Sequence, residues 1–123
     1  MMTIYRLLIS LSHHPGVVTL NSAEDELVLV RIKDYLSRDK DGRRRAVLEM
    51  FLENGPYETK DIDDRLREKN FDVKNKGTPA MVGLMGSKTG ILSVDVTGDH
   101  NMYSIKEKYK HLVKEALRAT ENA

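Results

Sequence analysis

The sequence predicts a mainly α fold with a small β-hairpin wing: a winged helix-turn-helix with an added N-terminal helix and a C-terminal helix. Apolar residues recur at helical spacing through most of residues 22–87. The period then changes to alternation at 91–96, and a turn at 97–101 leads into a second short strand at 102–105. An amphipathic segment follows at 106–120. Three short helices followed by a two-stranded wing are the element order of a winged helix-turn-helix.

The first 21 residues differ from the rest and are treated as an N-terminal extension. They are apolar around a turn signal at His13–Gly16, and three interpretations fit them: a short hairpin, a frayed helix, or a start codon placed too far upstream. A helix is predicted at 23–37, where Ser22 can act as the N-cap and three acidic residues follow in the first turn. Residues 22–42 are therefore assigned to an N-terminal helix and turn.

Residues 43–120 are assigned to the winged-helix domain with its C-terminal helix. Its first helix is predicted at about 43–54, where an Asn-Gly-Pro sequence ends an apolar stripe. The second is predicted from about residue 59 to about residue 70. The third, at about 78–87, begins with a threonine followed by proline, which is a strong helix start.

The composition and charge of the chain exclude several classes of protein. Twenty Lys and Arg residues nearly cancel nineteen Asp and Glu residues in 123 residues, so the chain is not a polycation that binds by bulk charge alone. The absence of cysteine excludes disulfides, zinc ribbons and thiol catalysis. No apolar run approaches the roughly 20 residues of a membrane span, and no signal peptide is recognised. We therefore expect a cytoplasmic protein with no membrane partner.

No combination of residues indicates an active site, so we expect a protein that is not an enzyme and that uses no cofactor. The sequence identifies no catalytic residue, no metal ligand set and no small-molecule substrate. The segment Ser37–Gly42 resembles the first half of an EF-hand loop, but the twelfth position of that loop would be Leu48 rather than glutamate. A helix–helix turn is the better interpretation. His100 and His111 have no second metal ligand at a fixed spacing.

In a helix-turn-helix the second helix of the pair enters the major groove of DNA, and here that helix is 78–87. Its expected core face consists of Ala80, Met81, Leu84 and Met85. Its expected outer face consists of Pro79, Val82, Gly83 and Gly86. No side chain on this outer face can pair with a base edge. The helix therefore predicts weak sequence specificity.

Basic residues around this helix are predicted to contact the DNA backbone. Helix N-terminal amides with nearby lysines form a candidate phosphate site, and an arginine cluster at the start of the 43–54 helix can add contacts. The predicted nucleic-acid-binding residues are Lys74, Asn75, Lys76, Thr78, Lys88, Arg43, Arg44 and Arg45. The predicted wing disfavours this interpretation, because residues 93–105 contain two aspartates and no Lys or Arg. Ordinary solvated charges are the alternative.

Two apolar surfaces indicate a protein partner instead. The 23–37 helix is apolar over much of its circumference, which predicts homodimerisation through it. Glycines on the outer face of the 78–87 helix would let another backbone approach closely, and each costs roughly 1 kcal/mol in a helix without such a contact. The predicted interface residues are Leu27, Val28, Val30, Val82, Gly83 and Gly86. Packing within the monomer is the alternative for both surfaces.

Three parts of the sequence are distinctive: Asp39–Leu48, then Ala80–Leu84 with Lys88–Leu92, then Tyr103–Tyr109. Together they resemble an archaeal family of small winged-helix proteins of unknown function. The resemblance covers about residues 31–118, and its most specific part is the Met-Val-Gly-Leu stretch followed by Gly-Ile-Leu. It implies a winged-helix fold in an archaeal cytoplasmic protein, and it supplies no activity or catalytic residue.

We therefore expect a winged-helix, helix-turn-helix protein that forms a dimer and binds DNA in a transcription-regulator-like role with weak sequence specificity. The alternative is a protein-interaction or dimerisation module of the same fold with no DNA binding.

Overall fold

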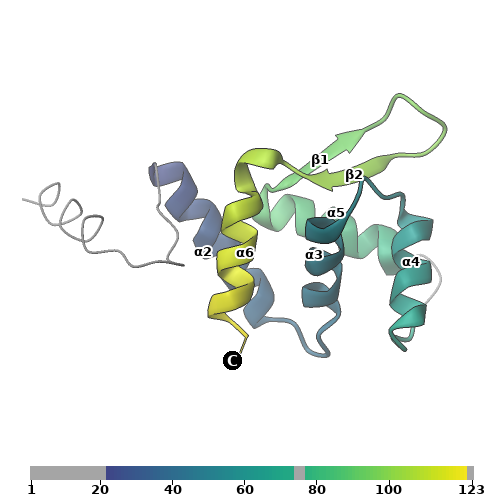
Figure 1. The fold of residues 1–123 in the computed structure, drawn as a ribbon, viewed down its shortest axis with the longest axis horizontal. Helices are drawn as coiled ribbons and strands as arrows, with labels where there is room; N and C mark the ends of the chain where they lie inside the picture. The colour runs from purple at the N-terminus through teal and green to yellow at the C-terminus, as the bar shows by residue number, and fades with distance from the viewer. Residues whose placement is uncertain (1–21, 74–76, 122–123) are drawn as a thin grey trace, which may run out of the picture.

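The computed structural model describes residues 22–73 and 77–121, so the predicted N-terminal extension lies outside the described residues. The elements are, in chain order, α2 (Ala23–Ser37), α3 (Arg43–Glu53), α4 (Thr59–Glu68), α5 (Gly77–Thr89), β1 (Leu92–Asp95), β2 (Met102–Ile105), the 3-10 turn η1 (Glu107–Tyr109) and α6 (Lys110–Ala119) (Figure 1). The fold is mainly helical with an antiparallel hairpin, which confirms the predicted fold class. No helix in the described ranges has the length and apolar character needed to cross a membrane.

The wing is joined to the helices by a short bridge. β1 and β2 pair antiparallel, with Leu92 opposite Ile105. The Tyr57 N–H, between α3 and α4, donates to the Tyr103 carbonyl oxygen at 2.9 Å, and the Tyr103 N–H donates back to Tyr57 at 2.7 Å. The segment after α3 thus forms an isolated β-bridge to β2, which joins the hairpin to the helices.

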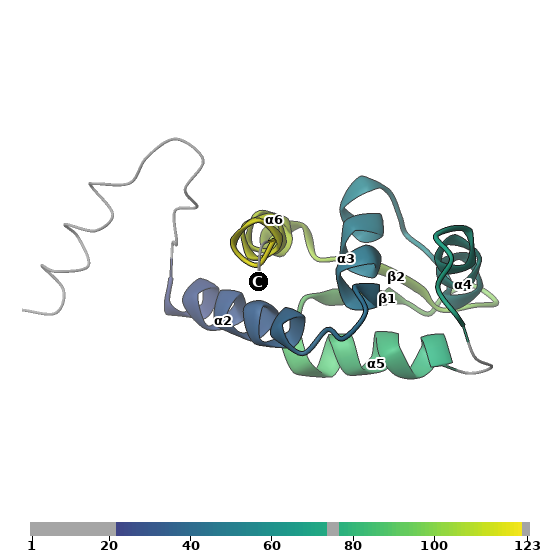
Figure 2. The ribbon, with the colours of Figure 1, turned by 90° about the horizontal axis from the view of Figure 1, so that it is seen from below.

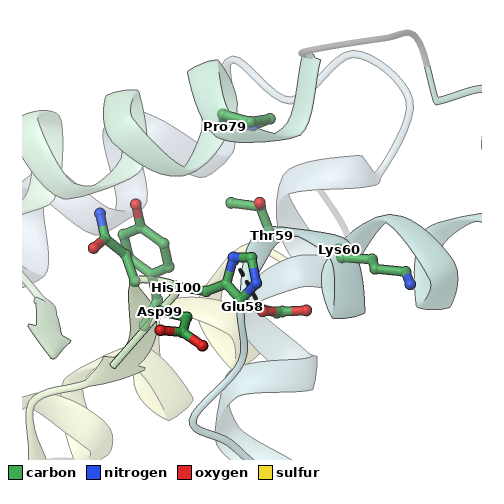
Figure 3. Close-up of a pocket in the computed structure, with 8 residues that line it drawn as sticks. Glu58, Thr59, Lys60, Pro79, Asp99 and His100 are labelled. Atoms are coloured by element: carbon green, nitrogen blue, oxygen red, sulfur yellow. Dashed lines mark ion pairs between the residues drawn. The ribbon is translucent and has the colours of Figure 1, made fainter. Parts of the chain in front are cut away.

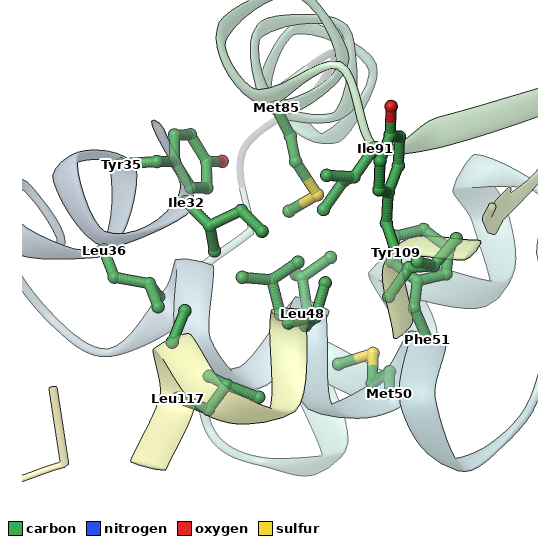
Figure 4. Close-up of a cluster of buried hydrophobic side chains, with 14 of the residues drawn as sticks. Ile32, Tyr35, Leu36, Leu48, Met50, Phe51, Met85, Ile91, Tyr109 and Leu117 are labelled. Atoms are coloured by element: carbon green, nitrogen blue, oxygen red, sulfur yellow. The ribbon is translucent and has the colours of Figure 1, made fainter. Parts of the chain in front are cut away.

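The helices share one apolar core. Ile32 of α2, Leu48 of α3, Met85 of α5 and Leu112 of α6 are all fully buried in it, and Figure 4 shows the first three facing one another. α2 packs against both α6 and α5 (Figure 2). The N-terminal helix α2 is therefore part of the same core as the helices that follow it.

Polar side chains cap the N-termini of two of the helices. Ser22 Oγ accepts a hydrogen bond from the Asp25 N–H at 3.1 Å, which confirms the predicted N-cap of α2. At α4, Asp61 Oδ2 accepts a hydrogen bond from the Glu58 N–H at 3.1 Å, and Glu58 completes the capping box. Such caps satisfy amides that have no partner inside the helix.

The acidic turn between α2 and α3 also acts as a helix cap. The two carboxylate oxygens of Asp39 accept hydrogen bonds from the N–H groups of Arg44 and Arg45, each at 3.1 Å. Asp41 accepts one from the Arg43 N–H at 3.0 Å. The carboxylates that resemble an EF-hand loop therefore satisfy the first amides of α3. This is the helix–helix turn that the sequence favoured.

Candidate nucleic-acid interface

Helix α5, the second helix of the predicted helix-turn-helix pair, lies along one edge of the molecule (Figure 2). The side chains that it buries are Thr78, Val82, Met85 and Thr89. Its exposed residues are Gly77, Pro79, Ala80, Gly83, Leu84, Ser87 and Lys88. The predicted core face is confirmed at Met85, which is fully buried, and at Met81, which is partly buried against the core. It was wrong at Ala80 and Leu84, which are exposed, and it omitted Val82, which faces the core.

Buried threonines explain why α5 is rotated relative to the orientation that its apolar residues predict. Thr89 Oγ1 donates to the Met85 carbonyl oxygen at 2.6 Å and accepts a hydrogen bond from the Ile91 N–H at 3.3 Å. A threonine whose hydroxyl bonds to the preceding helical turn can occupy a core position. An assignment of faces that counts only apolar residues misses such positions. The helix also begins at Gly77, one residue before its predicted start.

Two predicted contact residues are thereby removed from the surface. Thr78 is 2% exposed and Val82 is 1% exposed, so neither side chain can reach another molecule. The predictions of Thr78 as a nucleic-acid contact and of Val82 as an interface residue were wrong. The predicted contacts Lys74, Asn75 and Lys76 lie outside the described residues.

The two glycines of the predicted interface have different surroundings. A Cβ at Gly86 would lie 3.7 Å from Cδ1 of Leu92, so β1 packs against this glycine within the monomer. A Cβ at Gly83 would meet nothing within 4 Å in the described part of the chain. The face around Gly83 is open, and its neighbours Pro79 and Ala80 have no side-chain group that can read a base.

Arg43 and Arg45 are occupied by contacts inside the protein. Arg43 Nη2 donates to the Asp72 carbonyl oxygen at 2.6 Å, beyond the end of α4. Arg45 donates to the Leu117 carbonyl oxygen at 3.0 Å and to Thr120 Oγ1 at 2.6 Å, at the end of α6. These contacts correct the prediction that both arginines assist phosphate binding, because their guanidinium groups join α3 to neighbouring elements.

Arg44 joins α3 to α2. Its guanidinium carbon lies 4.3 Å from the centre of the Tyr35 ring, and its Nη1 donates to the Tyr35 carbonyl oxygen at 2.8 Å. Arg44 therefore also supports the fold. Unlike the other two arginines, however, it lines a surface groove.

This groove, of about 390 Å³, lies between α2 and the C-terminal half of α5. Its lining residues are Val30, Arg31, Asp34, Tyr35, Arg38, Arg44, Leu84 and Lys88. The single carboxylate among them, Asp34, lies 3.4 Å from Arg38. Four cations against one carboxylate give the groove a net positive charge beside the end of α5. Of the predicted contact residues, Lys88 and Arg44 lie here.

Sequence reasoning missed Arg31 and Arg38, the cations that α2 contributes to this groove. They precede the arginine cluster of α3, in a part of the chain where acidic residues are abundant. The signal was nevertheless present. The two arginines are seven residues apart, a spacing that places them on the same side of a helix.

Tyr35 lies beneath the groove. It is 2% exposed, and its hydroxyl has no hydrogen-bond partner among the described residues. In Figure 4 the hydroxyl points toward Met85 of α5. Burial raises the pKa of Tyr35 to about 12, with the neighbouring Arg44 guanidinium acting in the opposite direction.

The wing carries negative charge. Asp95 Oδ1 accepts hydrogen bonds from the Thr97 hydroxyl at 2.6 Å and from its N–H at 2.9 Å, and these lower the pKa of the Asp95 carboxyl. A hollow of about 690 Å³ lies between the wing turn and the starts of α4 and α5 (Figure 3). There His100 Nδ1 lies 3.8 Å from Oε2 of Glu58, with Asp99 beside them. These carboxylates make the hollow a poor phosphate site.

Within residues 22–73 and 77–121, no group of three or more His, Asp and Glu residues could hold a metal ion.

The predicted interface residues of α2 lie on two opposite sides of the helix. Val28 is 4% exposed and belongs to the core, so its prediction as an interface residue was wrong. Leu27 and Val30 are 49% and 61% exposed on the opposite side. Packing within the monomer thus accounts for only part of the apolar surface of α2.

A family model described as a protein of unknown function, DUF2551, matches residues 32–113. The chain belongs to this family. The DUF2551 match begins within α2 and ends within α6, so it contains α3, α4, α5 and the β-hairpin. An uncharacterised protein from Archaeoglobus fulgidus is 36% identical over 91 residues, which are 74% of this chain and 93% of that protein. The resemblance to a family of unknown function with an archaeal member is confirmed. No solved structure matches the chain.

Proposed function

We propose that this DUF2551 protein binds duplex DNA through the phosphate backbone, as a regulator-like winged-helix protein that acts by binding rather than by catalysis. The observation that supports this proposal is the groove at the C-terminal end of α5. There Arg38, Arg44 and Lys88 bring positive charge beside the helix that a helix-turn-helix presents to DNA. The phosphate backbone supplies most of the affinity of such non-specific contacts.

The length of α5 fits the major groove. Thirteen residues at about 1.5 Å per residue make a helix of about 20 Å, and the major groove is about 12 Å wide. When the open middle of the helix around Gly83 sits in the groove, the cations at its C-terminal end reach the phosphates of one wall. Lys74 and Lys76 precede the opposite end in the sequence, where the helix dipole also favours phosphate.

Weak sequence specificity follows from the side chains that α5 exposes. Pro79, Ala80 and Gly83 have no side-chain donor or acceptor, so this part of the helix can contact the groove only by shape. Ser87 and Lys88, at its C-terminal end, are the exposed side chains of α5 that can bond to a base or a phosphate. The exposed carboxylates of Asp95 and Asp99 repel phosphate and lower the affinity further. We expect modest affinity that differs little between DNA sequences.

Fluorescence anisotropy with labelled duplexes across a salt series tests the proposal. For the wild type, the logarithm of the association constant should fall linearly with the logarithm of salt concentration. Lys88→Ala and Arg38→Ala should each reduce this slope by about 1, equally on two unrelated duplexes. Lys114→Ala removes an exposed cation on α6 and is the matched control, with an unchanged slope. An absence of duplex binding at low salt would contradict the proposal.

A second candidate function is a protein-interaction module of the same fold with no DNA binding. It is favoured by two exposed apolar side chains that line the groove: Val30, at 61% exposure, and Leu84, at 41%. Exposed apolar surface of this kind marks interaction sites. Gly83→Leu should then abolish assembly with the partner while leaving the circular dichroism spectrum unchanged, and duplex binding should be absent at low salt.

A further inference from the structure

The outward side of α2 carries a regular stripe of residues. They are Ala23, Leu27, Val30, Asp34 and Ser37, and all are exposed. Their spacing of four, three, four and three residues is that of a coiled-coil seam, with two residues in each heptad. The exposed side chains of Leu27 and Val30 are at its centre. Because the core-facing residues of α2 lie on the opposite side of the helix, the stripe is available to a partner.

The positions beside the stripe carry charges in a matching order. Glu24 and Arg31 lie on one side of it, and Glu26 and Lys33 lie on the other. On each side the acid comes seven residues before the base. Two copies of α2 packed antiparallel bring Glu24 of each copy opposite Arg31 of the other, and Glu26 opposite Lys33. Every flanking contact then joins opposite charges, which is how flanking positions select partner and orientation.

A parallel pair fits less well. Identical seam positions meet in a parallel coiled coil, so Asp34 would face Asp34 of the second copy, and Lys33 would face Arg38 across the seam. An antiparallel pair instead sets Leu27 against Val30 and moves Asp34 to the two ends of the contact. It also places the N-terminus of each helix beside the C-terminus of the other, which the helix dipoles favour.

We propose that the protein forms a homodimer in which α2 pairs antiparallel with α2 of a second copy, with Leu27 of each packing against Val30 of the other. Glu24 and Arg31 beside the seam are exposed, and Glu26 and Lys33 are partly exposed. Arg31 makes no ion pair with any residue that the structure describes. Glu24 accepts a hydrogen bond from the Tyr109 hydroxyl and lies 3.6 Å from Lys108, and its side chain is still 59% exposed.

The helix pair and the proposed DNA site meet at the groove between α2 and α5, because Val30 and Asp34 of the stripe also line this groove. α2 lies at the end of the molecule away from α4 and the wing turn (Figures 1 and 2). Gly83 is not among the residues that line the groove. The proposed dimer and the proposed DNA site both involve the groove, but they use different cations. Arg31 contributes to the contact between helices, and Arg38 and Lys88 contribute to DNA binding.

The mass of the full chain in solution, measured without DNA by sedimentation equilibrium, tests the dimer. The wild type should have twice the 14.0 kDa mass of one chain at high concentration. Val30→Arg should have the mass of one chain, with an unchanged circular dichroism spectrum. Val96→Arg is the matched control, because Val96 is 66% exposed in the wing, and it should keep the mass of two chains. A single-chain mass for the wild type, or the same mass for both variants, would overturn the proposal.

Charge exchange tests the antiparallel register. Arg31→Glu alone and Glu24→Arg alone should each have the mass of one chain, because like charges then meet at both ends of the contact. An equal mixture of the two variants should recover the mass of two chains, because each acid then faces a base. Glu26→Lys and Lys33→Glu repeat the exchange on the other side of the seam. If folded variants stay single chains when mixed in both experiments, this register is wrong.

Discussion

Arg45 tests directly whether the arginines at the start of α3 support the fold or bind DNA. Its guanidinium donates to the Leu117 carbonyl oxygen at 3.0 Å and to Thr120 Oγ1 at 2.6 Å, which joins α3 to the end of α6. Arg45→Ala removes both contacts and leaves that carbonyl oxygen without its charged donor. Arg45→Lys keeps the charge but replaces the planar fork with a single ammonium group, so we expect it to retain one contact at most.

The size of the effect follows from the number and burial of these hydrogen bonds. A hydrogen bond to a charged group contributes about 1.5–3 kcal/mol. Both contacts of Arg45 are partly buried, so the lower value applies to each, and their sum is about 3 kcal/mol. For a domain of this length, a change of 1 kcal/mol shifts the melting temperature by about 4 °C. We therefore predict a decrease of about 12 °C in the melting temperature of Arg45→Ala.

Two assays separate the structural role from DNA binding. Urea unfolding followed by circular dichroism measures the change in the free energy of unfolding, and anisotropy with a duplex measures the salt dependence of binding. Arg45→Ala should lose about 3 kcal/mol of unfolding free energy and keep the wild-type salt slope, and Arg45→Lys should be intermediate in stability. Arg45 instead binds DNA if Arg45→Ala unfolds within about 0.5 kcal/mol of the wild type and has a reduced salt slope.

Two further predictions concern a buried hydroxyl and the orientation of α5. Burial raises the pKa of Tyr35 from 10.0 to about 12, so the folded protein holds this proton more tightly than the unfolded chain. The contribution of Tyr35 to stability should be complete below pH 10 and should fall by about 1.4 kcal/mol per pH unit from there toward pH 12. Urea unfolding at each pH should show that Tyr35→Phe removes this decrease, and an equally steep decrease in the variant would count against it. At neutral pH, Gly83→Ala should raise the free energy of unfolding by about 1 kcal/mol because its helix position is open. Val82→Ala should lower it by about 2 kcal/mol because Val82 is buried, and the opposite order would show that Val82 faces outward.

The order of elements could be predicted because it depends on local signals. The change from helical to alternating periodicity before the wing is visible in the sequence, and so is the cap at Ser22. The bridge between Tyr57 and Tyr103 has no such signal, because it depends on where the wing lies relative to the helices. The sequence suggested only that the segment around Tyr57 is extended.

The orientation of α5 could not be predicted from apolar residues alone. The predicted face consisted of Ala80, Met81, Leu84 and Met85. Met85 is buried as predicted, but the other buried residues of α5 are Thr78, Val82 and Thr89, and Ala80 and Leu84 are exposed. The hydrogen bond from Thr89 to the Met85 carbonyl oxygen removes the cost of burying the hydroxyl. Periodicity has no means of showing that such a bond forms. As a result, the predicted outer face was misplaced. Weak sequence specificity remains a prediction, now for the face of α5 that the structure exposes.

The candidate site was predicted in part. Lys88 was recognised because it follows the helix-turn-helix in the sequence, and it lies in the α2–α5 groove. Arg31 and Arg38 were missed because they join this groove only when α2 packs beside α5, a contact between segments far apart in the chain. The arginine cluster of α3 was overvalued for the same reason, since the internal acceptors of Arg43 and Arg45 lie in distant segments.

The salt dependence of duplex affinity shows whether the region around α5 binds DNA through the phosphate backbone. Wild-type protein and the double variant Arg38→Ala/Lys88→Ala would be compared by anisotropy on two duplexes of unrelated sequence. We predict parallel lines for the two duplexes in a plot of log affinity against log salt, with a slope that is smaller by about 2 in the double variant. Affinity that does not change with salt, or a double variant with the wild-type slope, would contradict backbone-mediated DNA binding around α5.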